Sequence, residues 1–198
     1  MELKQNFPEL SVFAVVGDVK DKKRVEGVFK KFHPSFVFHS AAYKHVPMVE
    51  KNPYEGVQTN VWGTRVVAEA SGRNKVKKFV LVSTDKAVNP TNIMGATKRA
   101  AEISVNGIGG AFPETKYVTV RFGNVLGSSG SVIPLFKHQI SQGGPVTVTH
   151  KDIERYFMSI PEAARLVLKS SLLGNGGEIF VLDMGEAVKI YDLAKQVI

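Results

Sequence analysis

Short apolar segments alternate with helical stretches along almost the whole chain, and this alternation restricts the fold more than any other feature. Runs rich in β-branched and aromatic residues predict strands at 11–16, 36–40, 79–83, 117–122 and 178–182. Amphipathic spacing between them predicts helices at 22–31, 53–72, 93–105, 133–141, 161–173 and 190–198. Strands that alternate with helices predict an α/β fold, with a parallel sheet covered by helices on both faces.

The composition fits one globular domain. The chain has 198 residues, of which 43% are hydrophobic. It has no cysteine, which excludes disulfides and thiolate metal sites and fits a cytoplasmic protein. No apolar run approaches the roughly 20 residues of a membrane span, and the first residues lack the apolar stretch of a signal peptide. We therefore expect a cytoplasmic chain that makes no membrane contact of its own.

The chain is basic, with a net charge of +8. Basic residues cluster at 20–24 and 73–78, where a solvated face beside helix and strand ends is the simplest interpretation. The sequence has neither zinc-finger spacing nor an RNA-binding aromatic signature, so no nucleic-acid partner is expected. The histidines lack metal-ligand spacing with carboxylates, so no metal site is expected either.

Polar groups follow four of the predicted strands, at the point where each strand ends. They are Gly17-Asp18, the stretch 40–45, the stretch 83–86 and Gly123-Asn124. Ligands of open α/β sheets bind beyond the carboxyl ends of the strands. The sequence therefore predicts that these groups converge on one binding site.

Each candidate residue also has a structural interpretation. Asp18 could accept hydrogen bonds from an adenine amine or a ribose hydroxyl, but taken alone it is better explained as the N-cap of helix 22–31. Ala41 and Ala42 would let a ligand approach the backbone, or let a strand and a helix pack tightly. Asp85 and Lys86 could act as acid and base, or form a surface ion pair of little energetic consequence.

Met94 and Lys98 lie four residues apart on a predicted helix and so share a face. Short-chain dehydrogenases have Tyr-x-x-x-Lys at this spacing. Their lysine binds the nicotinamide ribose and lowers the pKa of the tyrosine, which exchanges a proton with the substrate. A thioether has no titratable proton, so Met94 cannot perform this step. From its chemistry alone, Met94 is a packing residue.

The chain resembles the polysaccharide-biosynthesis (CapD-type) branch of the extended short-chain dehydrogenase/reductase superfamily. Its best-described members are nucleotide-sugar 4,6-dehydratases that act on UDP-N-acetylglucosamine. The resemblance implies an NAD(P)-binding, Rossmann-like parallel sheet of the extended type. It is carried, in the family's order, by GDVKD (17–21), HSAAYKHVPMVE (39–50), NVWGTRVVAEA (60–70), VSTDKAVNPTNIMGATKR (82–99), RFGNVLGSSGSVIPLF (121–136), RYFMSIPEAARLVL (155–168) and GEIFVLDMG (177–185).

The resemblance implies a reaction in which hydride leaves C4 of the sugar for NAD+ and a ketone forms there. Lys86 would then remove the C5 proton, Asp85 would protonate the departing C6 hydroxyl, and hydride would return to C6. Thr84 would hydrogen-bond the C4 oxygen, and Lys98 would position the nicotinamide ribose. Met94 matches a membrane-attached branch of the family that has methionine in the tyrosine position. How the C4 hydroxyl loses its proton there is left open.

The resemblance also assigns binding residues. Adenine would meet Asp18 and Val19. The NAD channel would be lined by Ser40, Ala41, Ala42, Lys44, Asn60 and Ser83. Asn124, Val132 and Arg155 would hold the UDP-sugar, with His45 near them. Two segments are expected to bind the substrate, at about 123–160, which contains Asn124, Val132 and Arg155, and at about 174–198.

The chain departs from the family at its start, because it lacks the first strand–Gly-x-Gly-x-x-Gly–helix–strand unit. The predicted strand 11–16 would therefore have no neighbour, and strand 36–40 would have a bare hydrophobic edge. We expect a single truncated Rossmann-type domain over 1–198, as a piece of a longer protein anchored at the inner face of the cell membrane. Alternatively, a homo-oligomer supplies the missing strands, or the chain is a non-catalytic remnant.

The sequence thus predicts an NAD-dependent lyase, a UDP-N-acetylglucosamine 4,6-dehydratase of surface polysaccharide biosynthesis. One alternative is an inactive nucleotide-sugar-binding fragment, which the missing glycine loop favours. Another is an NAD-dependent nucleotide-sugar epimerase. Epimerases have Ser-Ser/Thr after the strand where this chain has Thr84-Asp85-Lys86, and the presence of Asp85 and Lys86 argues against that alternative.

Overall fold

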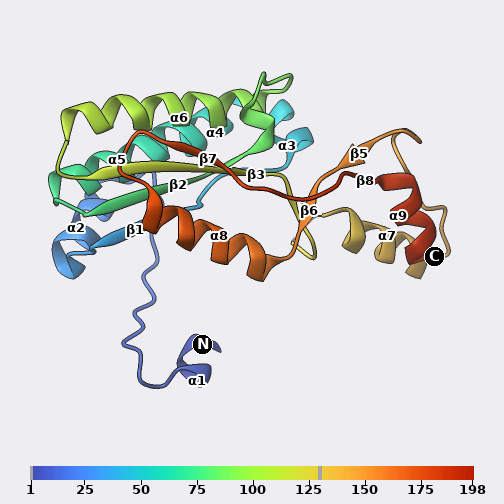
Figure 1. The fold of residues 1–198 in the computed structure, drawn as a ribbon, viewed down its shortest axis with the longest axis horizontal. Helices are drawn as coiled ribbons and strands as arrows, with labels where there is room; N and C mark the ends of the chain where they lie inside the picture. Colours follow the sequence, from blue (N-terminus) through green and yellow to red (C-terminus); the bar gives the residue numbers. More distant parts are fainter. Residues whose placement is uncertain (1, 129–130) are drawn as a thin grey trace.

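A four-stranded parallel sheet forms the centre of the computed structural model, which describes residues 2–128 and 131–198 (Figure 1). The order is β1-β2-β3-β7, with β1 at Phe36–His39, β2 at Lys78–Thr84, β3 at Lys116–Phe122 and β7 at Ile179–Val181. Every neighbouring pair is parallel. The carboxyl ends of the strands therefore lie at one edge. Met1 and, within the stretch 121–136, Ser129 and Gly130 lie outside the described residues.

Helices cover both faces of this sheet, as the sequence predicts (Figure 1). α4 (Pro53–Gly56), α5 (Thr64–Arg73) and α6 (Ile93–Ala111) lie on one face, and α8 (Ile160–Leu173) lies on the other. α2 (Lys22–Phe32) belongs to the first group, because its Phe29 packs in the same core cluster as α5 and α6. Alternate residues of β2 point to opposite faces. Phe79 and Leu81 pack with the first group of helices, and Val80 packs with Ala163 of α8.

A smaller lobe lies beyond the carboxyl ends of the strands (Figure 1). It contains α7 (Val132–Ser141), α9 (Ile190–Val197) and an antiparallel pair of β5 (Glu154–Arg155) and β8 (Val188–Lys189). Phe136, Ile190 and Ala194 form its core. A parallel pair of short strands, β4 (Asn124–Val125) and β6 (Phe157–Met158), belongs to the chain segments that connect the sheet to this lobe. The lobe is built from the two segments predicted to bind substrate, and that role stays a prediction.

The predicted helix 53–72 is continuous but not uniformly α-helical. Between α4 and α5 the backbone forms a π-helical segment, Val57–Gly63. Such segments are rare and often accompany functional sites. Asn60 lies within it and is completely buried. Within the described residues, no helix combines the length and the apolar character needed to cross a bilayer.

The prediction of a strand at 11–16 is wrong. These residues have no ladder partner, and Phe13 and Val16 are 69% and 90% exposed. The segment runs away from the sheet towards α1 (Glu2–Asn6), as Figure 1 shows. A β-rich sequence becomes a strand only where a neighbouring strand accepts its hydrogen bonds, and local propensity cannot supply that neighbour.

A buried chain of polar groups links β1 to the helices that cover it. His39 Nε2 lies 2.9 Å from Thr64 Oγ1, and the Thr64 hydroxyl donates to the Asn60 carbonyl at 2.7 Å. The Thr64 oxygen must therefore accept from His39, which assigns the ring proton to Nε2. Burial lowers the pKa of His39 to about 4, and the charge of Lys98 acts in the same direction. His39 is therefore neutral at physiological pH.

We expect the folded state to lose stability as the pH falls from 6.5 towards 4. The pKa of His39 is about 4 in the folded chain and 6.5 in the unfolded chain, so the unfolded chain binds more protons in this window. The expected loss between pH 7 and pH 5 is about 2 kcal/mol. Urea unfolding at both pH values measures it. His39→Gln should remove this part of the pH dependence, and an unchanged pH dependence in that variant would contradict the assignment.

Candidate active site

A cavity of about 410 Å³ opens at the carboxyl ends of the strands. Its walls come from the loop after β1, the end of β2, the first two turns of α6, the segment after β3 and the start of α7. The predicted site residues that line it are Ser40, Ala42, Lys44, His45, Ser83, Thr84, Lys86, Met94, Lys98, Asn124 and Val132. The cavity thus brings together most of the residues that the strand-end rule and the family resemblance selected.

Thr84, Asp85 and Lys86 form a compact hydrogen-bonded group at the end of β2. The strand ends at Thr84 and turns into a short 3₁₀ helix, Asp85–Ala87. The Thr84 hydroxyl donates to Asp85 Oδ1 at 2.8 Å, and Lys86 Nζ donates to the same oxygen at 3.0 Å. Asp85 is not among the residues that line the cavity, but its partners Thr84 and Lys86 are, and its Oδ2 lies beside Gly123, which also lines the cavity. The arrangement provides one carboxylate and one ammonium that share a hydrogen bond at the cavity wall.

Met94 and Lys98 lie on the first turns of α6, facing the cavity. The helix begins at its N-cap Asn92, whose side chain accepts from the Gly95 amide at 2.8 Å. Lys98 is buried, and its Nζ donates to the Val82 carbonyl at 2.7 Å. Burial lowers the pKa of Lys98 to about 8, while the Glu102 carboxylate acts in the opposite direction. Lys98 therefore stays largely protonated at neutral pH and can donate to a ligand oxygen.

Asn60 supports the cavity from behind and does not line it. Its Oδ1 accepts from the Tyr43 amide at 2.7 Å, and its Nδ2 donates to the Tyr43 carbonyl at 3.0 Å and to Thr97 Oγ1 at 2.9 Å. These bonds fix the loop after β1 against the π-helical segment and α6. Asn60 therefore shapes the wall, although sequence reasoning placed it in the cofactor channel.

Asp18 and Val19 lie outside the cavity. Asp18 is exposed and accepts from the Lys20 amide at 2.8 Å. The alternative interpretation of Asp18 as the N-cap of the following helix is wrong, because Asp21 fills that position and accepts from the Arg24 amide at 2.9 Å. Val19 is half-buried and packs against the core cluster that includes Phe79 and Leu81. Contact of either residue with adenine stays a prediction.

Ala41 and Arg155 are the other predicted residues that do not line the cavity. Ala41 is half-buried beside the lining residues Ser40 and Ala42. Arg155 is exposed on β5, and one of its guanidinium nitrogens donates to the Glu154 carbonyl at 2.8 Å. The structure thus holds Arg155 in the small lobe, away from the cavity wall.

Sequence reasoning missed several lining residues, among them Phe122, Val125, Ser131 and Phe157. Ser131 precedes α7 at the N-cap position, which its type and place could have indicated. Its hydroxyl is buried and has no hydrogen-bond partner among the described residues. Phe157 comes from a two-residue strand that only pairing with β4 defines, so no local signal marked it.

No group of three or more His, Asp or Glu residues that could hold a metal occurs in residues 2–128 and 131–198.

Comparison with known proteins gives a family and several close relatives. The model of a family described as polysaccharide biosynthesis protein matches residues 1–198. The capsular polysaccharide biosynthesis protein CapD of Staphylococcus aureus is 58% identical over 93% of this chain and 31% of its own length. A UDP-N-acetylglucosamine 4,6-dehydratase (inverting) of Campylobacter jejuni is 41% identical over 98% of this chain and 59% of its own. A UDP-glucose 4-epimerase of Rickettsia rickettsii is 40% identical over 91% of this chain and 52% of its own length.

Solved structures share the fold. Pen from Bacillus thuringiensis superposes with a TM-score of 0.90 at 39% identity, over 100% of this chain and 61% of that one. DesIV of Streptomyces venezuelae, a dTDP-glucose 4,6-dehydratase with NAD bound, gives a TM-score of 0.84 at 20% identity. The match covers 91% of this chain and 61% of the DesIV chain. The chain thus spans about a third of CapD and about 60% of the dehydratase and of these solved chains.

Proposed function

The chain belongs to the polysaccharide biosynthesis protein family, and from this premise we propose that it carries the catalytic residues of an NAD-dependent UDP-N-acetylglucosamine 4,6-dehydratase. The observation that carries the proposal is the Asp85–Lys86 pair at the cavity wall, with a hydrogen bond of 3.0 Å between its charged groups. Elimination of water from a sugar needs a base at C5 and an acid at C6. This pair offers both, side by side.

The two roles require that a proton moves within the pair first. As an ion pair, Lys86 has no free lone pair and Asp85 has no proton to give. Transfer of one proton from Lys86 Nζ to Asp85 Oδ1 along their hydrogen bond yields a neutral amine and a neutral acid. Bound ligands that exclude water favour this neutral pair, because charges lose their hydration there. The amine then takes the C5 proton and the acid protonates the leaving C6 hydroxyl, so the protons balance.

The cavity also has groups suited to NAD. When bound, NAD supplies a hydride acceptor at C4 of the sugar and a hydride donor at C6. Lys98 Nζ can donate to the nicotinamide ribose, and the small side chain of Ala42 lets a ring approach the backbone. The Thr84 hydroxyl donates its proton to Asp85, so it would accept a hydrogen bond from the C4 hydroxyl of the sugar. About 410 Å³ lies at the lower end of the ~300–1,000 Å³ range of ligand pockets, which suits the reacting parts of the two ligands.

The start of α7 fits the diphosphate of a UDP-sugar. Ser131 and Val132 place the N-terminus of this helix at the cavity. The first amides of a helix have no partner within the helix and favour an anion. The buried Ser131 hydroxyl adds a donor that has no hydrogen-bond partner among the described residues. Together these groups support a phosphate-bearing substrate whose sugar points towards Lys86.

A UDP-glucose 4-epimerase is the second candidate, because the Rickettsia relative is about as similar as the Campylobacter dehydratase. Epimerisation at C4 needs a hydride acceptor and a base for one hydroxyl. It expels no hydroxyl group and so needs no acid at C6. The Asp85–Lys86 pair has no task in that reaction, which favours the dehydratase.

Calorimetry and mass spectrometry on the purified chain test the proposal. NAD+ and UDP-N-acetylglucosamine are first titrated separately, and both should bind. The chain is then incubated with both, and the UDP-sugar should lose the mass of one water molecule. A product of unchanged mass but altered C4 configuration would assign an epimerase. If neither ligand binds, the described chain is not a sufficient catalytic unit and the proposal fails for it.

A further inference from the structure

Glu102 is a buried carboxylate on α6, one turn beyond Lys98, and its side chain has no exposed surface. Its Oε1 accepts from the Ser83 hydroxyl at 2.6 Å and from Arg121 Nε at 2.8 Å. Its Oε2 accepts from a second Arg121 nitrogen at 2.6 Å and from Arg99 at 3.0 Å. Burial alone would raise the pKa of Glu102, but the hydrogen bonds from these donors lower it below its usual value. The buried group therefore stays charged.

The partners of Glu102 lie at the ends of the strands that carry the site. Ser83 and Arg121 are opposite each other in the register of β2 and β3, one position before Thr84 and Phe122. One carboxylate thus joins the next-to-last residues of both strands to α6. Lys98 joins the same helix to β2 one turn earlier, through the Val82 carbonyl. These two attachments set the distance between Lys98 and the Thr84–Lys86 group across the cavity.

The bond to Glu102 also determines what Ser83 can offer to a ligand. A serine hydroxyl has one proton and two lone pairs. The proton is donated to Glu102, whereas Ser83 itself lines the cavity. The Ser83 hydroxyl can therefore only accept a further hydrogen bond.

We propose that Glu102 is a positioning residue of this site, which fixes the ends of β2 and β3 against α6 and makes Ser83 an obligate hydrogen-bond acceptor. The matching ligand group is a donor, such as a ribose hydroxyl or a carboxamide amino group. The inference rests on the proposed function for the identity of the ligand. The hydrogen-bond geometry does not depend on it.

Amide hydrogen exchange in the chain without ligand tests whether Glu102 fixes the ends of β2 and β3 against α6. In Glu102→Gln, the amide nitrogen faces one of the two Arg121 donors, so the two-point contact is lost. Exchange at 83–86 and 122–124 should rise about tenfold or more. Glu69→Gln is the matched control, because Glu69 also accepts from two arginines, Arg65 at 2.7 Å and Arg73 at 3.1 Å, but lies on α5 outside the cavity. Equal exchange at 83–86 in the two variants overturns the proposal.

A second variant covers the case in which Glu102→Gln does not fold. Arg121→Lys keeps the charge but cannot form the two-point contact, so it should raise exchange at the same amides. Unchanged exchange at 83–86 in Arg121→Lys overturns the proposal.

A double-mutant cycle on NAD+ affinity separates positioning from general destabilisation. Glu102→Gln should weaken NAD+ binding about tenfold when Ser83 is present and much less in a Ser83→Ala background, because the effect passes through Ser83. If the effects of the two substitutions on NAD+ affinity are additive, the proposed role of Ser83 as an obligate acceptor is overturned. If the unmodified chain does not bind NAD+, the proposed function fails, whereas the exchange comparison still decides the role of Glu102.

Discussion

Replacing Asp85 by asparagine or Lys86 by methionine should abolish dehydration and leave the binding of UDP-N-acetylglucosamine nearly unchanged. Each variant removes one member of the acid–base pair joined by the 3.0 Å hydrogen bond. The new side chains are about as large as the original ones, so neither variant reduces the space in the cavity for the UDP-sugar. General acid and base groups each contribute roughly 10²–10⁴-fold to a rate. We therefore expect kcat to fall at least ~10²-fold in either variant. The double variant should fall little further, because the pair works as a unit.

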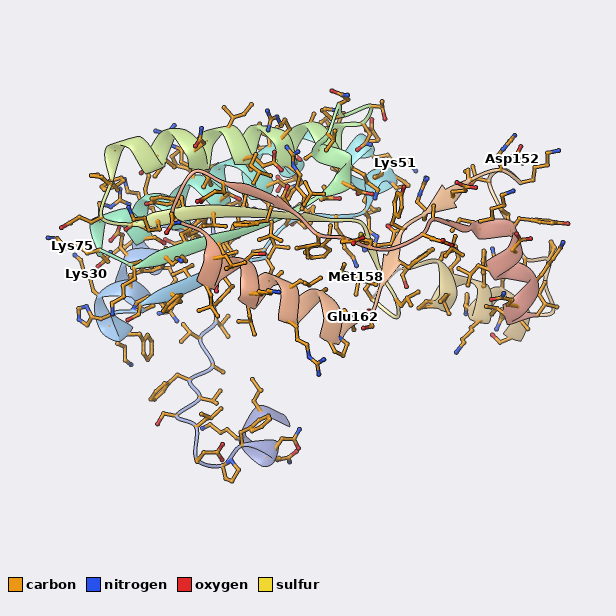
Figure 2. All side chains as sticks on the ribbon, viewed as in Figure 1. Lys30, Lys51, Lys75, Asp152, Met158 and Glu162 are labelled. Carbon is orange, nitrogen blue, oxygen red and sulfur yellow. The ribbon has the colours of Figure 1, made fainter. Side chains whose placement is uncertain are left out.

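Formation of the dehydrated sugar, followed by mass spectrometry in a form of the protein that binds both ligands, measures this effect. Lys75→Met and Glu114→Gln are the matched controls, because Lys75 and Glu114 form an exposed ion pair of 3.3 Å. In Figure 2, Lys75 lies at the end of the sheet where the strands begin. The cavity is lined by residues from the other ends of the strands. Both controls should keep full activity. Full activity in Asp85→Asn or Lys86→Met would show that the roles are assigned to the wrong residues.

The substitution Gly95→Ala should destabilise the fold by about 3 kcal/mol and disrupt the site, although alanine is the better helix former. A Cβ on Gly95 would overlap the Lys86 carbonyl oxygen and come within 3.2 Å of Pro90 Cβ. The Lys86 carbonyl and Pro90 both belong to the turn segment that carries or directly follows the acid–base pair. α6 and this turn would have to separate, and Lys86 would move away from Lys98.

Gly107→Ala is the control in the same helix, because nothing lies within 4 Å of the added Cβ. There the helix preference of alanine should stabilise the fold by up to ~1 kcal/mol. The same substitution in one helix should therefore act with opposite signs at two positions. Urea unfolding of both variants measures this. If Gly95→Ala is as stable as Gly107→Ala, the close approach of α6 to the turn does not constrain the site.

Much of the fold was predictable because its elements are encoded locally. The apolar runs at 36–40, 79–83 and 117–122 became β1, β2 and β3 within a residue or two. The helix predicted at 93–105 extends to Ala111, past Gly107, Gly109 and Gly110. There, packing against Tyr117 outweighs the low helix propensity of glycine. Conversely, the strand expected at 11–16 did not form, because a strand depends on a neighbour that the sequence of that strand cannot specify.

The sequence by itself determined which residue types stand at the strand ends, and the rule that these ends share one edge brought Thr84, Lys86 and Lys98 to one cavity. The tertiary structure alone decided what surrounds them. Glu102 meets Ser83 and Arg121, and Asn60 meets Tyr43, across separations of 17 to 19 residues and between different elements. Such partners are selected by burial, since a buried polar group must find its hydrogen bonds wherever the packing of the whole chain places them.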